Sequence, residues 1–219
     1  MNIEQDFLLS ANKFPIPESI HSCPGISING STIRSVWLST DLAYIQNLDM
    51  DAVMTLNPFK KSTCLDEVII NFSNKPVFCD VGGGLLREKQ VIEHANHVIK
   101  AGSPGVVITK PTAPKIVKNI KEEIDGMLIY TIVFDAEPVQ ELADSGVDIF
   151  NISTGELTAT SVKKLRDKLP EIPIMANGGS HDSAIRETIE AGADAIVFNP
   201  PTATEILRSV FDTYRSQQV

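Results

Sequence analysis

Three residues with side chains suited to proton transfer or anion binding each follow a short apolar run. Asp80 could act as a general base or orient a ligand hydroxyl, and Lys110 could bind an anion, act as a base or form a Schiff base. His181 stands at or near a predicted helix start, where the helix dipole keeps an imidazole neutral. We therefore predict Asp80, Lys110 and His181 as catalytic candidates.

Each of these candidates also has a structural interpretation, which the sequence leaves open. Asp80 could cap the following helix, Lys110 could be a solvated lysine at a loop start, and His181 could be a surface residue in a first helical turn. The neighbouring Cys79 is expected to be a small buried residue that points the other way along its strand.

Glycines and small polar residues at similar positions predict ligand binding. Gly178 and Gly179 would let the backbone approach a ligand, and Thr202 forms a predicted capping box with Glu205 at a helix start. Pro200–Pro201 remove two N–H donors just before that helix. The other candidate binding residues are Gly82, Gly83, Asn151, Ser153, Asn177 and Asn199, which Thr55, Thr109 and Tyr130 are expected to join.

Eight apolar, β-rich runs precede these residues, and segments with helical spacing of apolar residues separate the runs. The runs are apolar nearly throughout, which is typical of strands in a parallel sheet covered on both faces. Similar turns containing Asp51, Asp148 and Asp194 lead into three of them. The sequence therefore predicts a (β/α)8 barrel over residues 35–219, with an open doubly wound sheet as the alternative. The runs are Ser35–Ser39, Ala52–Leu56, Pro76–Cys79, Val106–Thr109, Met127–Val133, Asp148–Ile152, Pro173–Ala176 and Ala195–Phe198.

Residues 1–34 precede the first of these strands. Ile3, Phe7, Leu8 and Ala11 have the spacing of a short amphipathic helix, and Ile26–Ile33 resembles a hairpin with Asn-Gly as its turn. We expect this helix and hairpin to plug the bottom of the barrel in a structural role.

The run Ile174–Gly179, followed by a helix that ends at Ala191–Asp194, resembles the seventh and eighth units of phosphate-binding TIM barrels. That group includes phosphosugar isomerases and epimerases, indole-glycerol-phosphate-type lyases and FMN-linked oxidoreductases. The resemblance covers residues 173–205 and implies a phosphate held by the glycines after strand seven and by a helix start after strand eight. The chain departs from the pattern at Pro200–Pro201, which puts the strand-eight contribution in doubt.

Composition and charge narrow the classes of partner. The chain has 219 residues with 19 Lys and Arg against 28 Asp and Glu, a net charge of −9, which argues against nucleic-acid binding. Its three cysteines form no C-x-x-C pair, and the acidic N-terminus does not resemble a secretory signal, so we expect a reducing cytoplasm. The longest apolar stretch, Met127–Phe134, is too short to cross a membrane.

The leading functional prediction is an enzyme that acts on a small phosphorylated metabolite, either an isomerase or epimerase or a carbon–carbon lyase. No cofactor and no metal site are predicted; His94 and His97 have a possible metal spacing but fall on an outer helix, where we interpret them as structural. An FMN-linked oxidoreductase and a non-catalytic, metabolite-binding barrel are the alternatives. Association into homo-oligomers stays open.

Overall fold

Eight parallel strands close into a barrel, which confirms the predicted (β/α)8 fold; the open-sheet alternative is wrong. The computed structural model describes residues 16–47, 49–56, 62–83, 86–134, 137–179, 181–199 and 201–216, and of Lys110 only the backbone. Strand β10 pairs with β3 and so closes the ring. The barrel strands are β3 (Ser35–Leu38), β4 (Ala52–Met54), β5 (Val77–Gly83), β6 (Gly105–Lys110), β7 (Met127–Ile132), β8 (Ile149–Ile152), β9 (Ile174–Asn177) and β10 (Ala195–Phe198).

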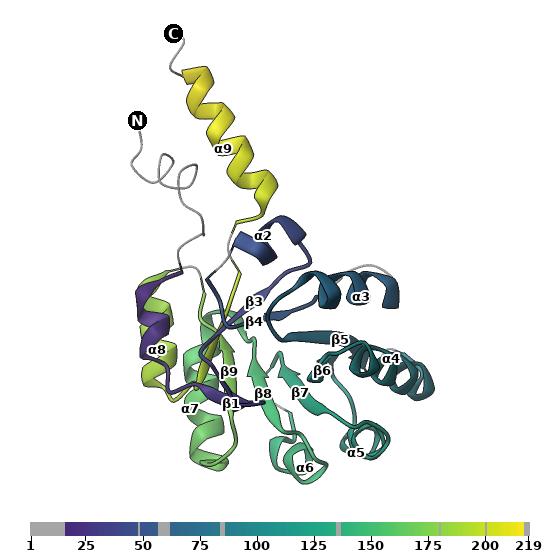
Figure 1. Ribbon diagram of the computed structural model, residues 1–219. Helices are drawn as coiled ribbons and strands as arrows, with labels where there is room; N and C mark the ends of the chain where they lie inside the picture. Colours follow the sequence, from purple (N-terminus) through teal and green to yellow (C-terminus); the bar gives the residue numbers. More distant parts are fainter. Residues whose placement is uncertain are drawn as a thin grey trace.

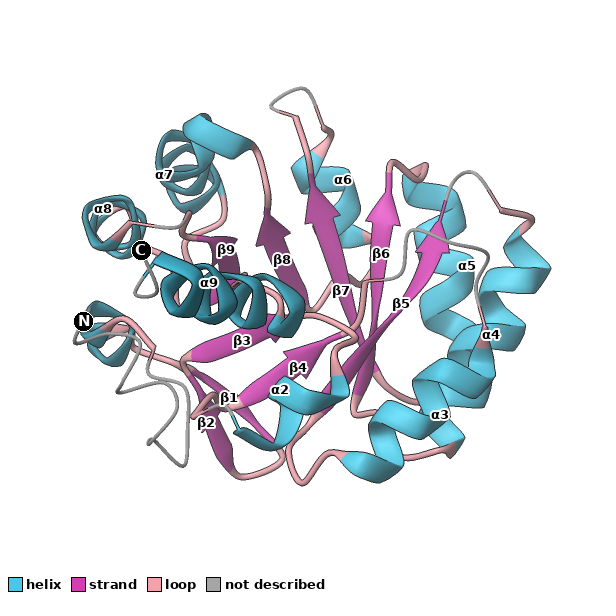
Figure 2. Cartoon of the chain, turned by 90° about the horizontal axis from the view of Figure 1, so that it is seen from above, coloured by secondary structure: helices cyan, strands magenta, loops and turns pink. Residues whose placement is uncertain are grey.

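Helices alternate with the strands, and most of them cover the outside of the ring (Figures 1 and 2). Their apolar faces follow the helical spacing of the sequence; in α4, for example, Val91, Ala95 and Val98 are buried against the barrel. None of the helices in the described part of the chain is both long and apolar enough to cross a lipid bilayer. The helices are α2 (Leu42–Asn47), α3 (Thr63–Phe72), α4 (Glu88–Lys100), α5 (Pro114–Glu123), α6 (Val139–Asp144), α7 (Thr158–Lys168, after the short η2, Gly155–Leu157), α8 (Asp182–Glu190) and α9 (Ala203–Ser216).

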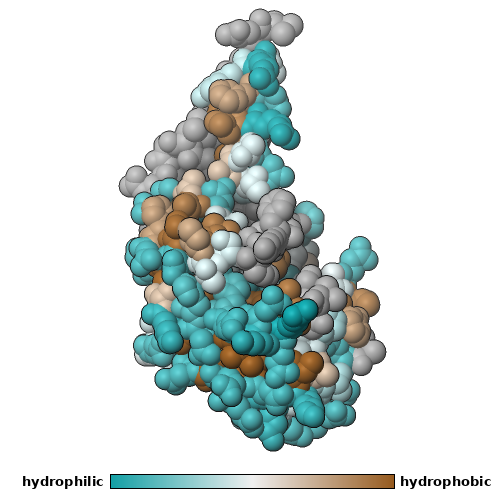
Figure 3. Space-filling view, turned by 90° about the vertical axis from the view of Figure 1, so that its right-hand side faces the viewer, coloured by the Kyte–Doolittle hydropathy of each residue, from teal (hydrophilic) through white to brown (hydrophobic). Residues whose placement is uncertain are grey.

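The last helix, α9, departs from this arrangement because it projects away from the ring, beyond α2 (Figure 1). Its side chains Leu207, Phe211 and Tyr214 stay about half exposed. Figure 3 shows a mostly hydrophilic surface over the body of the molecule, with hydrophobic side chains also on the projecting part.

The barrel wall separates two apolar cores, because side chains alternate between its two faces. The inner core contains Phe78, Val107, Ile129, Ile149 and Met175, one from each of five consecutive strands. The residues that follow these in sequence face outward and pack under the helices, as Cys79, Ile108, Tyr130 and Phe150 do. The predicted outward direction of Cys79 is thereby confirmed.

The hairpin predicted at Ile26–Ile33 forms as β1 (Ile26–Ile28) and β2 (Ser31–Ile33). Asn29 and Gly30 both have positive φ, 49° and 80°, as a two-residue hairpin turn requires. Ile26, Ile28 and Ile33 join the inner core of the barrel. The hairpin therefore packs against the inside of the barrel at the end where the strands begin, and the short η1 (Glu18–Ser22) packs beside α8. The helix predicted at Ile3–Ala11 lies outside the described residues.

The three repeated aspartates each connect neighbouring strands at their starting ends. Asp51 Oδ2 accepts hydrogen bonds from the backbone N–H groups of Arg34 and Ser35, and Asp148 Oδ2 accepts one from Leu128 N–H. Asp194 Oδ2 likewise accepts from Ile174 N–H. In each case the carboxylate accepts an N–H group from the first or second residue of the adjacent strand, so these aspartates hold the barrel together at the end opposite to the loops.

Candidate functional site at the barrel mouth

Asp80 lies on β5 and faces the interior of the barrel, two residues beyond the inner-core Phe78, and its side chain is 3% exposed. Its Oδ1 accepts hydrogen bonds from the Thr109 hydroxyl and from the Gly82 backbone N–H, both 2.8 Å long. Helix α4 begins at Glu88 and has Arg87 as its N-cap, so the alternative that Asp80 caps this helix is wrong. Asp80 is a fixed carboxylate at the end of the barrel where the strands terminate.

The glycines after Asp80 explain how the backbone returns to that carboxylate. The pairing of β5 with β6 shifts register between Asp80 and Gly83. Gly82 and Gly83 have φ of 91° and 134°, which a residue with a side chain rarely adopts. This irregularity lets the Gly82 N–H group donate to Asp80, so the two glycines shape the site through the backbone.

A chain of buried hydrogen bonds, which the sequence analysis missed, connects the outer helices to Asp80. The Asp80 backbone N–H donates to Thr55 Oγ1, and the Thr55 hydroxyl donates to Asp66 Oδ1; both contacts are 3.1 Å long. Asp66 Oδ2 lies 2.8 Å from Nε2 of His94, and both of these side chains are buried. Thr55 therefore stands outside the barrel wall and positions the backbone of Asp80.

The two histidines of α4 each pair with an acidic residue of α3. His97 Nε2 lies 2.6 Å from Glu67 Oε1, and His94 Nε2 lies 2.8 Å from Asp66 Oδ2. Among the residues that the structure describes, no three His, Cys, Asp or Glu side chains gather as a metal site would require. The two pairs connect α3 to α4 on the outside of the barrel, in line with the structural interpretation of these histidines.

Amide side chains continue the polar layer around the mouth on β8 and β9. Asn151 Nδ2 donates to Thr131 Oγ1 at 3.2 Å, and Asn177 Nδ2 donates to Ser153 Oγ at 2.7 Å. The Oδ1 atoms of both asparagines are buried and have no hydrogen-bond partner among the residues that the structure describes. Asp80, Thr109, Thr131, Asn151 and Asn177 thus form a polar arc across five consecutive strands, directly above the inner apolar core. Thr109 belongs to this arc, as predicted.

Tyr130 does not belong to the arc, so the expectation that it would join the mouth is wrong. Its ring lies in the outer core, and its hydroxyl donates to Glu137 Oε2 at 2.7 Å while accepting from the Thr112 backbone N–H at 2.9 Å. Burial raises the pKa of the Glu137 carboxyl above its ordinary value. The sequence analysis missed this buried carboxyl, because nothing in the local pattern around Glu137 shows that a tyrosine covers it.

The predicted phosphate-binding glycines have different surroundings. A Cβ added to Gly178 would lie 2.9 Å from Ile185 Cγ1 and 3.1 Å from Ile196 Cγ2, so this glycine allows α8 to pack closely on β10. Gly179 has φ of +75° and turns the chain toward α8, whose N-cap is His181. The His181 side chain is exposed, and so is Asn199 after β10.

The start of α9 already holds carboxylates where a phosphate was expected. Thr202 N–H donates to Glu205 Oε2 and Glu205 N–H to Thr202 Oγ1, which confirms the predicted capping box. Ala203 N–H donates to Asp41 Oδ2. Because the N–H groups of Thr202 and Ala203 both donate to acidic side chains, Thr202 contributes no N–H group to a phosphate in this arrangement.

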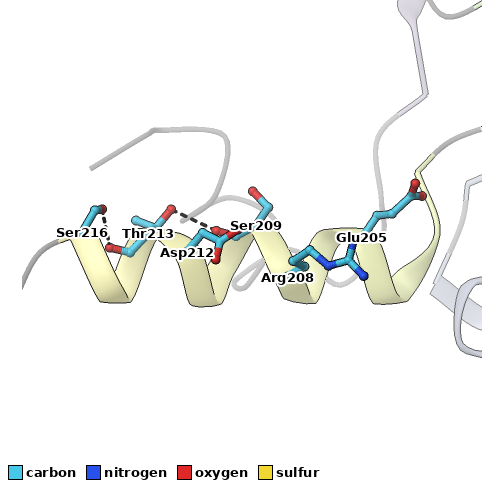
Figure 4. Close-up of a pocket in the computed structure, with 6 residues that line it drawn as sticks. All are labelled: Glu205, Arg208, Ser209, Asp212, Thr213 and Ser216. Atoms are coloured by element: carbon cyan, nitrogen blue, oxygen red, sulfur yellow. Dashed lines mark hydrogen bonds between the residues drawn. The ribbon is translucent and has the colours of Figure 1, made fainter.

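The remaining candidates and the surface hollows add little to the mouth. The Lys110 side chain and residues Gly84 and Pro200 lie outside the described part of the chain. A shallow hollow runs along α9 and is lined by Glu205, Arg208, Ser209, Asp212, Thr213 and Ser216 (Figure 4). All six come from one face of a single helix that projects from the barrel, so this hollow is not the candidate active site.

No protein family model matches the sequence, so similarity to known proteins concerns mainly the fold. A 4-hydroxy-3-methylbut-2-en-1-yl diphosphate synthase (flavodoxin) from Alteromonas mediterranea is 28% identical over 133 residues. This match covers 57% of the chain and 36% of that enzyme, so the chain corresponds to about a third of its relative.

Solved structures with the same architecture are more numerous, but their sequences are distant. A protein of Burkholderia cenocepacia named as a phosphonomutase has a TM-score of 0.67 at 14% identity, over 91% of this chain and 96% of its own. An oxaloacetate acetylhydrolase has a TM-score of 0.63 at 13% identity, over 83% and 79% of the two chains. N-acetylneuraminate lyase from Fusobacterium nucleatum has a TM-score of 0.60 at 13% identity, over 75% and 68%. The chain therefore shares its fold with TIM-barrel lyases and mutases of small metabolites.

Proposed function

We propose that this barrel is an enzyme that acts on a small phosphorylated metabolite at the C-terminal ends of its strands. The reaction class is isomerisation by proton transfer or cleavage of a carbon–carbon bond, with Asp80 as the general base. One observation carries the proposal: a buried carboxylate faces the mouth of the barrel and is held there by Thr109 and by Gly82 N–H.

The environment of Asp80 suits a base that must meet a carbon acid in a fixed direction. Both hydrogen bonds end on Oδ1, which orients the carboxylate, and the Thr55 hydroxyl fixes the backbone from the other side of the wall. Lys110 ends the neighbouring strand, with its backbone paired to Gly83, and is proposed as the electrostatic partner of the reacting group. His181, at the start of α8, is proposed as a second acid–base group.

The phosphate is proposed to bind on the α8 side of the mouth. Gly179 and the first turn of α8 offer backbone N–H groups and the positive end of a helix dipole, whereas the start of α9 is occupied by Asp41 and Glu205. The names of two similar proteins, a diphosphate synthase and a phosphonomutase, agree with phosphorylated or phosphonate substrates.

Proton exchange tests the proposal without knowledge of the product. The protein is incubated in D2O with a panel of phosphorylated hydroxyketones and hydroxyaldehydes, and loss of carbon-bound proton signals is followed by NMR. We expect exchange with at least one compound, lowered at least ~100-fold in Asp80→Asn and in Lys110→Ala, the usual size of one acid–base contribution. Asp167→Asn is a matched control, because Asp167 is an exposed residue of the outer helix α7.

Two outcomes would favour the alternative functions. A yellow purified protein with flavin absorbance would favour an FMN-linked oxidoreductase. Thermal stabilisation by a phosphorylated compound without any exchange or turnover would favour a non-catalytic barrel. Near-wild-type exchange in both Asp80→Asn and Lys110→Ala would exclude the proposed roles of these residues.

A further inference from the structure

The polar arc of the mouth contains two buried acceptors that nothing in the described part of the chain satisfies. Asn151 is 4% exposed, and its Oδ1 has no hydrogen-bond partner; the same holds for Oδ1 of Asn177 on the next strand. Buried polar atoms in folded proteins almost always have a hydrogen-bond partner. Two buried oxygens without one, at the same end of the barrel as Asp80, therefore call for an explanation. A molecule bound at the mouth would supply the missing partners.

Each of these acceptors stands beside a hydroxyl group. Asn151 Nδ2 donates to Thr131 Oγ1, and Asn177 Nδ2 donates to Ser153 Oγ. A hydroxyl that accepts a hydrogen bond still carries its own hydrogen, and neither Thr131 nor Ser153 donates that hydrogen to a group in the described part of the chain. The mouth therefore contains two sets of one acceptor and one donor: Asn151 Oδ1 with the Thr131 hydroxyl, and Asn177 Oδ1 with the Ser153 hydroxyl.

An alcohol hydroxyl is the complement of such a pair, because it donates one hydrogen bond and accepts others. An ammonium group could donate to the asparagine carbonyls but could not accept from Thr131 or Ser153. A carbonyl oxygen could accept from these hydroxyls but would leave both asparagine oxygens unsatisfied. The arrangement thus selects hydroxyl groups over either of these alternatives.

The spacing of the two pairs fits a single small molecule. Asn151 is paired in register with Met175, so Asn177 lies one strand across and two residues further along. With ordinary strand spacing and rise, the two α-carbons are about 8 Å apart, and both side chains point into the barrel. The inner apolar core closes the space below them, so the molecule must approach from the mouth.

We infer that Asn151 and Asn177 are specificity residues that bind two hydroxyl groups of the substrate, so that the ligand is a diol. The two hydroxyl sites follow from Asn151 and Asn177 alone. The phosphate group of the ligand, which would lie on the α8 side, rests on the proposed function. It identifies the substrate class as a polyhydroxylated phosphate ester, in which the hydroxyl-bearing end enters first and lies beside Asp80.

Binding of matched probes to the full-length protein tests this inference. sn-Glycerol 3-phosphate carries two hydroxyls and a phosphate, n-propyl phosphate carries the phosphate alone, and glycerol carries only hydroxyls. We expect isothermal titration calorimetry to give glycerol phosphate at least about tenfold higher affinity than propyl phosphate. Asn151→Leu and Asn177→Leu should each reduce this difference, whereas Asn71→Leu, the same change on the exposed outer helix α3, should leave it unchanged.

The stability of the free variants separates a binding role from a structural one. If Oδ1 of Asn151 is unsatisfied until a ligand binds, Asn151→Leu removes an unpaired acceptor, and its melting temperature should match or exceed that of the wild-type protein. A melting temperature several degrees lower in both Asn151→Leu and Asn177→Leu would assign these residues to the fold and overturn the inference.

The failure of this inference differs visibly from the failure of the proposed function. Equal affinities for glycerol phosphate and propyl phosphate would overturn the diol site and leave phosphate binding intact. Binding of glycerol that depends on Asn151, with no response to either phosphate ester, would support the diol site and contradict the phosphorylated substrate. No response to any of the three probes would overturn both.

Discussion

The hydroxyl of Thr109 donates a 2.8 Å hydrogen bond to Oδ1 of Asp80, joining β6 to β5 at the place where their register shifts. This contact connects two strands and orients the proposed base in one step. Thr109 is argued to act only through Asp80, so it is a positioning residue.

Thr109→Val should therefore lower turnover by about tenfold while leaving KM nearly unchanged, because one orienting hydrogen bond to a charged group is worth about 1.5 kcal/mol. Thr109→Ser keeps the hydroxyl and should restore most of the rate. Steady-state kinetics on the substrate found by proton exchange would check this split. A rise in KM without loss of kcat would contradict the positioning role.

The glycine pair after β9 allows packing to be separated from anion binding. Gly178→Ala would press its Cβ against Ile185 and Ile196, and overpacking of this kind costs about 1–3 kcal/mol of unfolding free energy. Gly179→Ala would strain a residue at φ +75° by roughly 1–2 kcal/mol, although its nearest neighbour, Ala184 Cβ, is 3.5 Å away. Urea unfolding of both variants, with and without the phosphate ester that binds most tightly, measures each effect.

The outcome for ligand binding should differ between the two glycine variants. Gly179 borders the proposed phosphate site, so Gly179→Ala should lose a larger share of the stabilisation by ligand than Gly178→Ala does. Equal losses would argue that the glycines serve only the packing of α8.

The aspartates at the strand starts should govern stability and not activity. Asp148 Oδ2 accepts from Leu128 N–H and from Lys121 Nζ, both at 2.7 Å, so Asp148→Ala leaves a strand N–H without its partner and the Lys121 ammonium with the Gly126 carbonyl but no carboxylate. We expect a loss of about 1–3 kcal/mol in unfolding free energy. Asp167→Ala on exposed α7 is the control, and turnover per folded molecule should be unchanged in both variants.

The pH dependence of stability should carry the signature of Glu137. Burial raises the pKa of its carboxyl above the ordinary 4.5, so the folded state holds this proton more tightly than the unfolded state does. As pH rises above 4.5, the unfolded chain therefore binds fewer protons at Glu137 than the folded protein does. The contribution of Glu137 to stability then falls with increasing pH.

Glu137→Gln cannot ionise and should accept the same hydrogen bond from Tyr130. The difference in unfolding free energy between Glu137→Gln and the wild-type protein should therefore grow in favour of the variant from pH 4 to pH 7. Chemical denaturation at several pH values measures it. A difference that shrinks over this range would show that the buried carboxylate is stabilised in its charged form.

The cysteines provide a test of the two-sided wall. Burial raises the pKa of Cys79 to about 12 and that of Cys23 to about 11, whereas Cys64 is exposed at the start of α3. Because the thiolate is the reactive form, iodoacetamide at pH 8 should add one group to the native protein, at Cys64, and three in denaturant. Peptide mass spectrometry identifies the sites, and rapid native labelling of Cys79 would contradict its placement under the helices.

Local patterns in the sequence determined the elements of this protein. Eight apolar runs, the Asn29-Gly30 turn and the Thr202 to Glu205 capping box all depend on residues within a few positions of one another, and each forms as predicted. The polar residues at the strand ends were also visible, since (β/α)8 barrels bring those ends to one rim.

Only the tertiary structure decided which of these residues face the mouth. Thr109 and Tyr130 are both polar residues near strand ends, yet Thr109 contacts Asp80 inside the barrel while Tyr130 covers Glu137 outside it. The reason is that a shift of one position along a strand reverses the face, and the phase is set by contacts with strands far away in sequence. The same holds for the start of α9, where Asp41, 162 positions from Ala203, takes the N–H group that the sequence pattern offers to a phosphate.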